Sequence, residues 1–133
     1  MKVLDGTFVI DYLAGEAPAR AYLEQHAHES FVIPTPAYAE ALVGEGNGPH
    51  QSDIDGVRND LSWAEVYPID ERTAVAAAGI ADEIGPEGPF LSGMDALIAA
   101  VGRELDAPVV SADQDLTHDE TKRVIAVEEY DQR

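Results

Sequence analysis

The stretch KVLDGTFVIDYL, residues 2–13, joins a short apolar run to a helical segment through one acid, Asp5. The run 2–5 is too short to alternate faces and is typical of a strand covered on both sides. In the segment 7–14 apolar residues recur at helical spacing, and Gly15 ends it. A strand that leads directly into a helix indicates the first unit of an α/β fold.

The same alternation continues along the chain. Further strands are predicted at 31–33, 66–69, 109–111 and 124–127, and helices at 17–27, 35–43, 53–63, 71–84 and 92–105. Glycine and proline mark loops at 44–49 and 85–89, and the tail 128–133 is polar. The pattern predicts a three-layer α/β/α sandwich with a central parallel sheet. At 133 residues, we expect a single domain, 1–133.

Charge is the most unusual property of the composition. There are 26 Asp and Glu against 8 Lys and Arg, for a net charge of −18, and the acids are spread along the chain. Such a surface suits concentrated salt, where the Debye length falls to about 3 Å at 1 M. We therefore expect a halophilic origin. No basic patch is visible for binding nucleic acid, so any nucleic-acid role would need metal ions to bridge the repulsion.

Other classes are excluded by what the chain does not contain. There is no cysteine, which rules out disulfides, a thiolate nucleophile and a Cys-type zinc site. No apolar run approaches the roughly 18 residues of a membrane span. The N-terminus carries Asp5 where a signal peptide would have its apolar stretch. We expect a soluble cytoplasmic protein.

Acids stand where a parallel sheet would collect them. Asp5 ends the first strand, and Asp113 and Asp115 follow the strand 109–111. Ligands of open α/β sheets bind beyond the carboxyl ends of the strands. Glu40 and Asp95 lie among small apolar residues of two helices, where an unpaired carboxylate is costly. Because basic residues are scarce, a divalent cation is the natural counter-ion, and oxygen ligands favour Mg²⁺ or Mn²⁺.

Each acid also has an ordinary structural interpretation. Asp5 and Asp113 are suited to capping the helices that follow them, and Asp95 to a helix first turn. Glu40 is consistent with a solvated helix residue. The functional interpretation is favoured because four such coincidences would be needed. The four histidines, His26, His28, His50 and His118, are most simply surface residues.

Four segments of the chain together resemble the PIN-domain family, in particular the ribonuclease toxins of VapBC-type toxin–antitoxin pairs. They are VLDGTFVIDYL (3–13), PTPAYAEAL (34–42), MDALIAA (94–100) and APVVSADQDL (107–116). Their order and spacing fit nearly the whole chain. Two positions depart from the family: Gly6, where many members have Thr or Ser, and Leu116, where an aromatic residue is common. The first departure puts a hydrogen bond beside Asp5 in doubt.

The resemblance implies a metal-dependent endoribonuclease that uses Mg²⁺ or Mn²⁺. It implies that Asp5, Glu40, Asp95 and Asp113 form the catalytic, metal-binding acidic cluster, with Asp115 as an accessory ligand. Thr7 and Ser111 match positions where the family often carries a hydroxyl. It also implies an RNA substrate, a homodimer and a small antitoxin protein that covers the first two helices, with Tyr12, Leu13, Tyr22 and Leu23 as candidate contacts or, alternatively, as core residues.

Other interpretations remain. A non-catalytic PIN-fold binding or scaffold module is the main alternative. Asp113, Asp115 and Thr117 match the signature of haloacid-dehalogenase-like phosphotransferases, but those enzymes open with that signature. An EF-hand-like loop at 51–62 lacks the ligand set. A response-regulator receiver needs a lysine after a late strand, whereas Lys122 precedes the last predicted one.

Overall fold

The computed structural model of this chain describes residues 1–130. Its strands are β1 (Lys2–Leu4), β2 (Phe31–Pro34), β3 (Glu65–Tyr67), β4 (Val109–Ser111) and β5 (Val127–Glu129). Its helices are α1 (Gly6–Leu13), α2 (Ala17–Gln25), α3 (Thr35–Gly46), α4 (Ile54–Asp60), α5 (Glu71–Ile84), α6 (Gly93–Leu105) and α7 (Asp119–Lys122).

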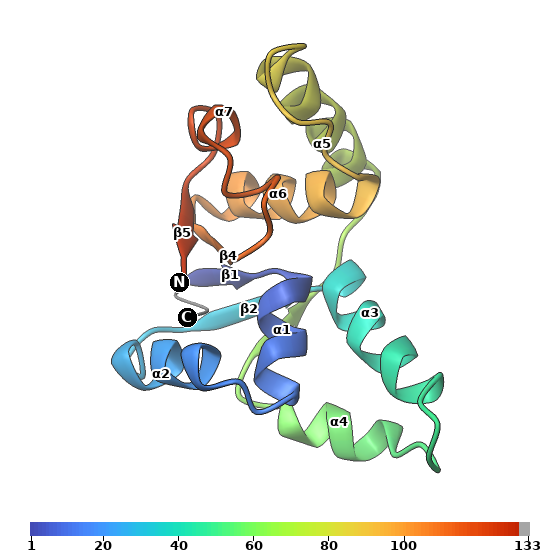
Figure 1. Cartoon of the computed structure of the whole chain (residues 1–133). Helices are drawn as coiled ribbons and strands as arrows, with labels where there is room; N and C mark the ends of the chain where they lie inside the picture. The colour runs from blue at the N-terminus through green and yellow to red at the C-terminus, as the bar shows by residue number, and fades with distance from the viewer. Residues whose placement is uncertain (131–133) are drawn as a thin grey trace.

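The strands form one parallel sheet in the order β3-β2-β1-β4-β5. The central strand β1 pairs Val3 with Val32 of β2 and with Val109 of β4. Helices α1, α2 and α4 lie on one side of the sheet, and α5, α6 and α7 on the other (Figure 1). This confirms the predicted α/β/α sandwich with a central parallel sheet.

The core explains why the central strands are mostly apolar. Both faces of β1, β2 and β4 are covered, and Val3, Leu4, Ile33, Val109 and Val110 are fully buried. The ring of Phe8 makes edge-on contacts with Tyr22 and Tyr130, which ties α1 to α2 and to the end of β5. Tyr22 is therefore part of the core, at 7% exposure, and not a free surface contact.

Most predicted elements are confirmed within a few residues, and α5 matches the expected bounds 71–84 because Asp70 caps its start and Gly85 ends it with a positive φ. Two predictions are wrong. Residues 44–46 continue α3 as helix, and the loop begins after them. The last strand is 127–129, because the amides of Val124 and Ile125 close a turn onto the carbonyl of Thr121. The tail prediction beyond residue 130 lies outside the described residues.

Across residues 1–130, no helix combines the length and the apolar character that crossing a bilayer requires.

Candidate metal centre

The site lies at the carboxyl edge of the sheet, between β1 and β4. The chain runs from β1 outward through β2 to β3 and then returns to β4 on the other side of β1, so β1 and β4 flank the topological switch point. Asp5 follows β1 directly, and Ser111 is the last residue of β4. The first turns of α1, α3 and α6 lie at the same edge (Figure 1).

Asp5 is a buried carboxylate, 1% exposed, and it is held by donors from two elements. Its Oδ1 accepts the backbone N–H of Phe8 at 2.9 Å and the Thr7 hydroxyl at 2.8 Å. Its Oδ2 accepts the hydroxyl of Ser111 across the sheet. The pKa of Asp5 is raised to about 6, mainly by burial and to a lesser extent by the nearby charge of Asp113, while these hydrogen bonds act to lower it.

Asp113 and Asp115 lie on the turn that follows β4. One oxygen of Asp113, Oδ2, accepts the backbone N–H groups of Asp115 at 2.9 Å and Leu116 at 3.0 Å. The carbonyl of Asp115 accepts the hydroxyl of Thr121 at 2.6 Å. These bonds fix the turn, so that both half-buried carboxylates are held in place by the backbone around them.

Asp95 comes from the first turn of α6, where its N–H donates to the N-cap hydroxyl of Ser92 at 3.0 Å. One carboxylate oxygen from each of Asp95, Asp113 and Asp115 lies within 4.8 Å of the others. We call these residues the acidic triad. Partial burial raises the pKa of Asp95 to about 6, and the charges of Asp113, Asp115 and Glu40 add to the rise.

Glu40 lies on α3 and is an exposed residue. Its Oε1 lies where a side chain at residue 6 would begin: a Cβ added to Gly6 would stand only 2.0 Å from it. Its negative charge contributes to the raised pKa of Asp95, but Glu40 is not one of the three carboxylates of the acidic triad.

The donor set fits a hard divalent cation. The acidic triad offers only carboxylate oxygens, the ligands that Mg²⁺ and Mn²⁺ prefer. Three carboxylates this close repel one another, and a bound cation would relieve that repulsion. Asp5 is different, since three donors already engage its oxygens.

The structure thus brings together three of the five predicted site residues as the acidic triad. Ser111 links Asp5 to Asp113, and Glu40 lies against Gly6. The capping interpretation also holds for two of them. Asp5 is the N-cap of α1, and Asp113 closes the turn after β4. Sequence analysis missed the roles of Ser92 and Gly6. Gly6 offers no hydroxyl, unlike the Thr or Ser that many family members have at this position. Asp5 nevertheless accepts two hydroxyl hydrogen bonds, from Thr7 and from Ser111.

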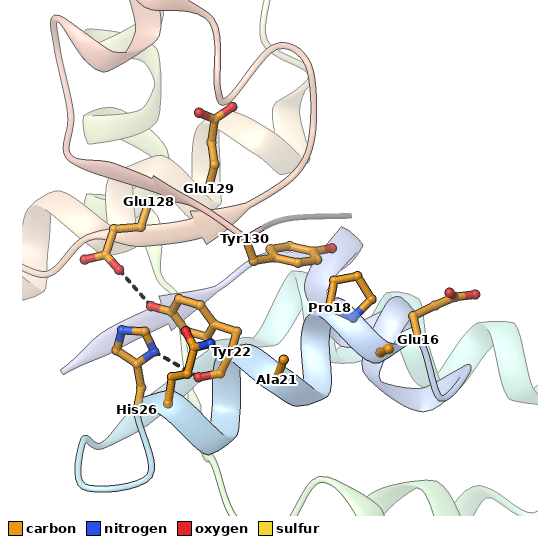
Figure 2. Close-up of a pocket in the computed structure, with 10 residues that line it drawn as sticks. Glu16, Pro18, Ala21, Tyr22, His26, Glu128, Glu129 and Tyr130 are labelled. Carbon is orange, nitrogen blue, oxygen red and sulfur yellow. Dashed lines mark hydrogen bonds between the residues drawn. The ribbon is translucent and has the colours of Figure 1, made fainter. Parts of the chain in front are cut away.

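A cavity of about 790 Å³ lies away from the acidic triad, between α2 and the end of β5 (Figure 2). Two of its acids, Glu128 and Glu129, are paired with neighbouring side chains. Glu128 accepts the Tyr22 hydroxyl at 2.8 Å and pairs with Lys2, and Glu129 pairs with Lys122 at 2.8 Å. We therefore place the candidate metal centre at the acidic triad and not in this cavity.

Comparison with solved structures supports the fold at low sequence identity. VapBC2 from Rickettsia felis bound to a DNA fragment from its promoter matches with a TM-score of 0.77 and 17% identity, covering 98% of each chain. FitAcB from Neisseria gonorrhoeae matches at 0.77 and 19%, and DNA-bound VapBC from Salmonella typhimurium at 0.75 and 19%, each covering 96% of both chains. No curated protein matches this chain.

A family model gives the assignment. The model described as PIN domain matches residues 2–122, which include the acidic triad, Asp5 and Glu40. The match covers most of the chain and agrees with the strand order and with the place of the acids at the sheet edge. This chain belongs to the PIN domain family.

Proposed function

We propose that this chain is a Mg²⁺- or Mn²⁺-dependent endoribonuclease, the toxin of a toxin–antitoxin pair, acting in the cytoplasm. The observation that carries the proposal is the acidic triad at the switch point of a PIN domain. The solved structures that resemble it include toxin–antitoxin complexes, which supports a toxin role.

The acidic residues have different proposed roles. Asp95, Asp113 and Asp115 would hold the cation, with Glu40 beside them. When bound, a divalent ion supplies charge neutralisation and lowers the pKa of a bound water. Asp5 acts through the scaffold: Ser111 donates to Asp5 and accepts the N–H of Asp113 at 2.9 Å, so β1 fixes the turn that carries two ligands. Without a cation, this concentration of negative charge would repel the phosphates of RNA.

The scaffold alternative is tested by the response to metal. Mn²⁺ is expected to raise the thermal midpoint of the wild type, and Asp95→Asn to abolish that rise. Asp82→Asn, which removes an exposed acid from α5, is the matched control and keeps the full response. A wild type that ignores Mn²⁺ would favour the non-catalytic module.

The antitoxin partner is proposed to bind a groove beside the site. A cavity of about 410 Å³ opens between α1, α3 and α4, with an apolar floor that includes Ile10, Leu13 and Val57. Glu40, Glu45 and Asp60 border it. An amphipathic helix would bury its apolar face here, and an arginine at its end would meet Glu40. This revises the predicted contact surface, because Tyr22 is in the core while Leu13 lines the groove.

Co-purification of the native protein followed by mass spectrometry tests the partner. A small protein is expected to accompany the wild type and to be lost with Ile10→Lys, which places a charge on the groove. Phe90→Lys changes an exposed phenylalanine between α5 and α6, outside both proposed protein interfaces, and should retain the small protein. An active nuclease that purifies without a small partner would contradict the toxin role and leave the nuclease role standing.

We also propose a homodimer through α5. Its buried face is made by Thr73, Ala77, Ile80 and Ile84, while Ala74, Val75, Ala78 and Gly79 face outward. Small outward residues allow close approach of a second helix. Light scattering at high salt checks this, and a monomer throughout the micromolar range would contradict it.

A further inference from the structure

We infer that the ring of Phe90 is a stacking surface for a base of the RNA substrate, close to the metal centre. Phe90 lies in the loop 85–92, which connects the end of α5 to the start of α6 (Figure 1). The inference rests on the proposed function and names a contact with RNA that lies outside the acidic triad.

Phe90 is the most exposed large apolar side chain among residues 1–130, at 91%. The rings of Phe8 and Phe31 are buried instead, and each makes an edge-on contact with another aromatic ring. A base stacks on the flat face of an aromatic ring, so both the base and the ring face must be open. Phe90 meets this requirement and the buried phenylalanines do not.

The backbone on either side of Phe90 is held in place. A Cβ placed on Gly88 would lie 3.0 Å from the Cβ of Glu120, so the loop passes directly against α7. Pro89 fixes its own φ, and Leu91 packs against the core. A ring presented by an ordered backbone loses less conformational freedom when a ligand binds it. The loop therefore favours binding through Phe90.

Both ends of this loop are connected to elements that carry the acidic triad. Ser92 caps α6, and its hydroxyl accepts the N–H of Asp95 at 3.0 Å. On the other side, α7 is tied to the triad because the Thr121 hydroxyl donates to the carbonyl of Asp115 at 2.6 Å. Two extended residues and one helical turn place the Cα atoms of Phe90 and Asp95 within about 13 Å of each other.

The charge of the chain makes a contact of this kind necessary. Proteins usually hold nucleic acid through Lys and Arg on its phosphates, and concentrated salt weakens that attraction. This chain has 26 acids against 8 Lys and Arg. Arg103 is engaged by Glu83, and Arg123 by the carbonyls at the end of α5. Stacking on an aromatic ring needs no opposite charge, so it can hold a base while a cation at the triad faces a phosphate.

The first experiment looks for the stacked base directly. Phe90→Trp places an indole at this position, and its fluorescence should be quenched when a base stacks on it. The full chain is titrated with single-stranded oligoadenylate in excess chelator and about 2 M KCl, where repulsion is screened beyond about 3 Å. An abasic oligonucleotide of the same length should cause no quenching. The wild type, whose single tryptophan is Trp63, gives the background signal.

The second experiment compares affinities for the same oligoadenylate by fluorescence anisotropy. Phe90→Leu keeps an apolar side chain and removes the ring, so its dissociation constant is expected to rise by about 5- to 150-fold, the effect of losing one stacked base. Phe90→Tyr keeps the ring and should stay within about twofold of the wild type. Val75→Ala, which shortens another exposed apolar side chain, is the matched control and should bind like the wild type.

The outcomes separate this inference from the nuclease itself. Wild-type affinity in Phe90→Leu, or equal quenching by the abasic oligonucleotide, would overturn the role of Phe90 and leave the nuclease standing. A changed molar mass of Phe90→Leu in light scattering, with unchanged affinity for oligoadenylate, would assign the ring to a protein interface and also overturn the inference. Base-dependent quenching in a protein whose wild type cleaves no RNA with Mn²⁺ would support the base contact and overturn the nuclease.

Discussion

The hydroxyl of Ser111, at the end of β4, donates a hydrogen bond to Oδ2 of Asp5, at the end of the neighbouring strand β1. The hydroxyl oxygen of Ser111 also accepts the backbone N–H of Asp113 at 2.9 Å. One buried side chain thereby connects the carboxylate that begins α1 to the turn that carries two members of the acidic triad. The stability of the sheet edge and the geometry of the site depend on the same bond.

Ser111→Ala is expected to lower the free energy of unfolding by about 1–3 kcal/mol at neutral pH. It removes a hydrogen-bond donor from the Asp5 carboxylate, which is only 1% exposed. Chemical denaturation at fixed high salt measures the change. Ser62→Ala removes an exposed hydroxyl that bonds the carbonyl of Asn59, and should change stability by less than about 0.5 kcal/mol. Equal effects of the two variants would contradict the role of Ser111.

The metal-free protein should lose stability as pH rises through about 6. The pKa of Asp5 is raised from 3.8 to about 6 by burial, so the folded state binds this proton more tightly than the unfolded state. The stabilisation is complete below pH 3.8 and is lost as pH rises through the folded value. The shift corresponds to about 3 kcal/mol. Asp95 adds a smaller share because it is only half-buried.

Asp5→Asn isolates this effect, since it resembles the protonated form at every pH. With chelator present, wild type and Asp5→Asn should have similar free energies of unfolding near pH 4, and the variant should become the more stable of the two by pH 8. A difference that does not change with pH would contradict the raised pKa.

Salt should stabilise the chain. With a net charge of −18, like charges repel in the folded state, and added KCl screens them. The thermal midpoint is expected to rise steadily between about 0.1 and 2 M KCl. A protein that is equally stable and monodisperse in dilute buffer would contradict a halophilic origin.

The sequence predicts the sheet edge well because strand ends and acids are local features. Asp5 could be placed there because it directly follows β1, and Asp113 and Asp115 because they lie in the turn after β4. The bounds of α5 were predictable from a capping aspartate and a terminal glycine. The position of β5 was not, because its apolar neighbours Val124 and Ile125 are used to close a turn.

What could not be predicted depends on packing between distant segments. No local pattern indicates that Glu40 lies against Gly6, since that contact arises when α3 packs beside α1. Asp5 is set apart from the acidic triad because its carboxylate accepts the hydroxyl of Ser111 from the neighbouring strand, and this contact also depends on tertiary packing. Residue identity predicted an acidic cluster, and tertiary packing determined which acids face one another.

The most direct test of the account is RNA cleavage at high salt by the wild type and by Asp95→Asn, each with Mn²⁺ and with excess chelator. Asp5→Asn, Glu40→Gln and Asp113→Asn are expected to behave like Asp95→Asn while remaining folded. The account predicts cleavage by the wild type with Mn²⁺. It predicts no cleavage by the wild type with chelator, and none by Asp95→Asn with either Mn²⁺ or chelator. Cleavage that survives excess chelator, or wild-type cleavage by Asp95→Asn, would contradict it.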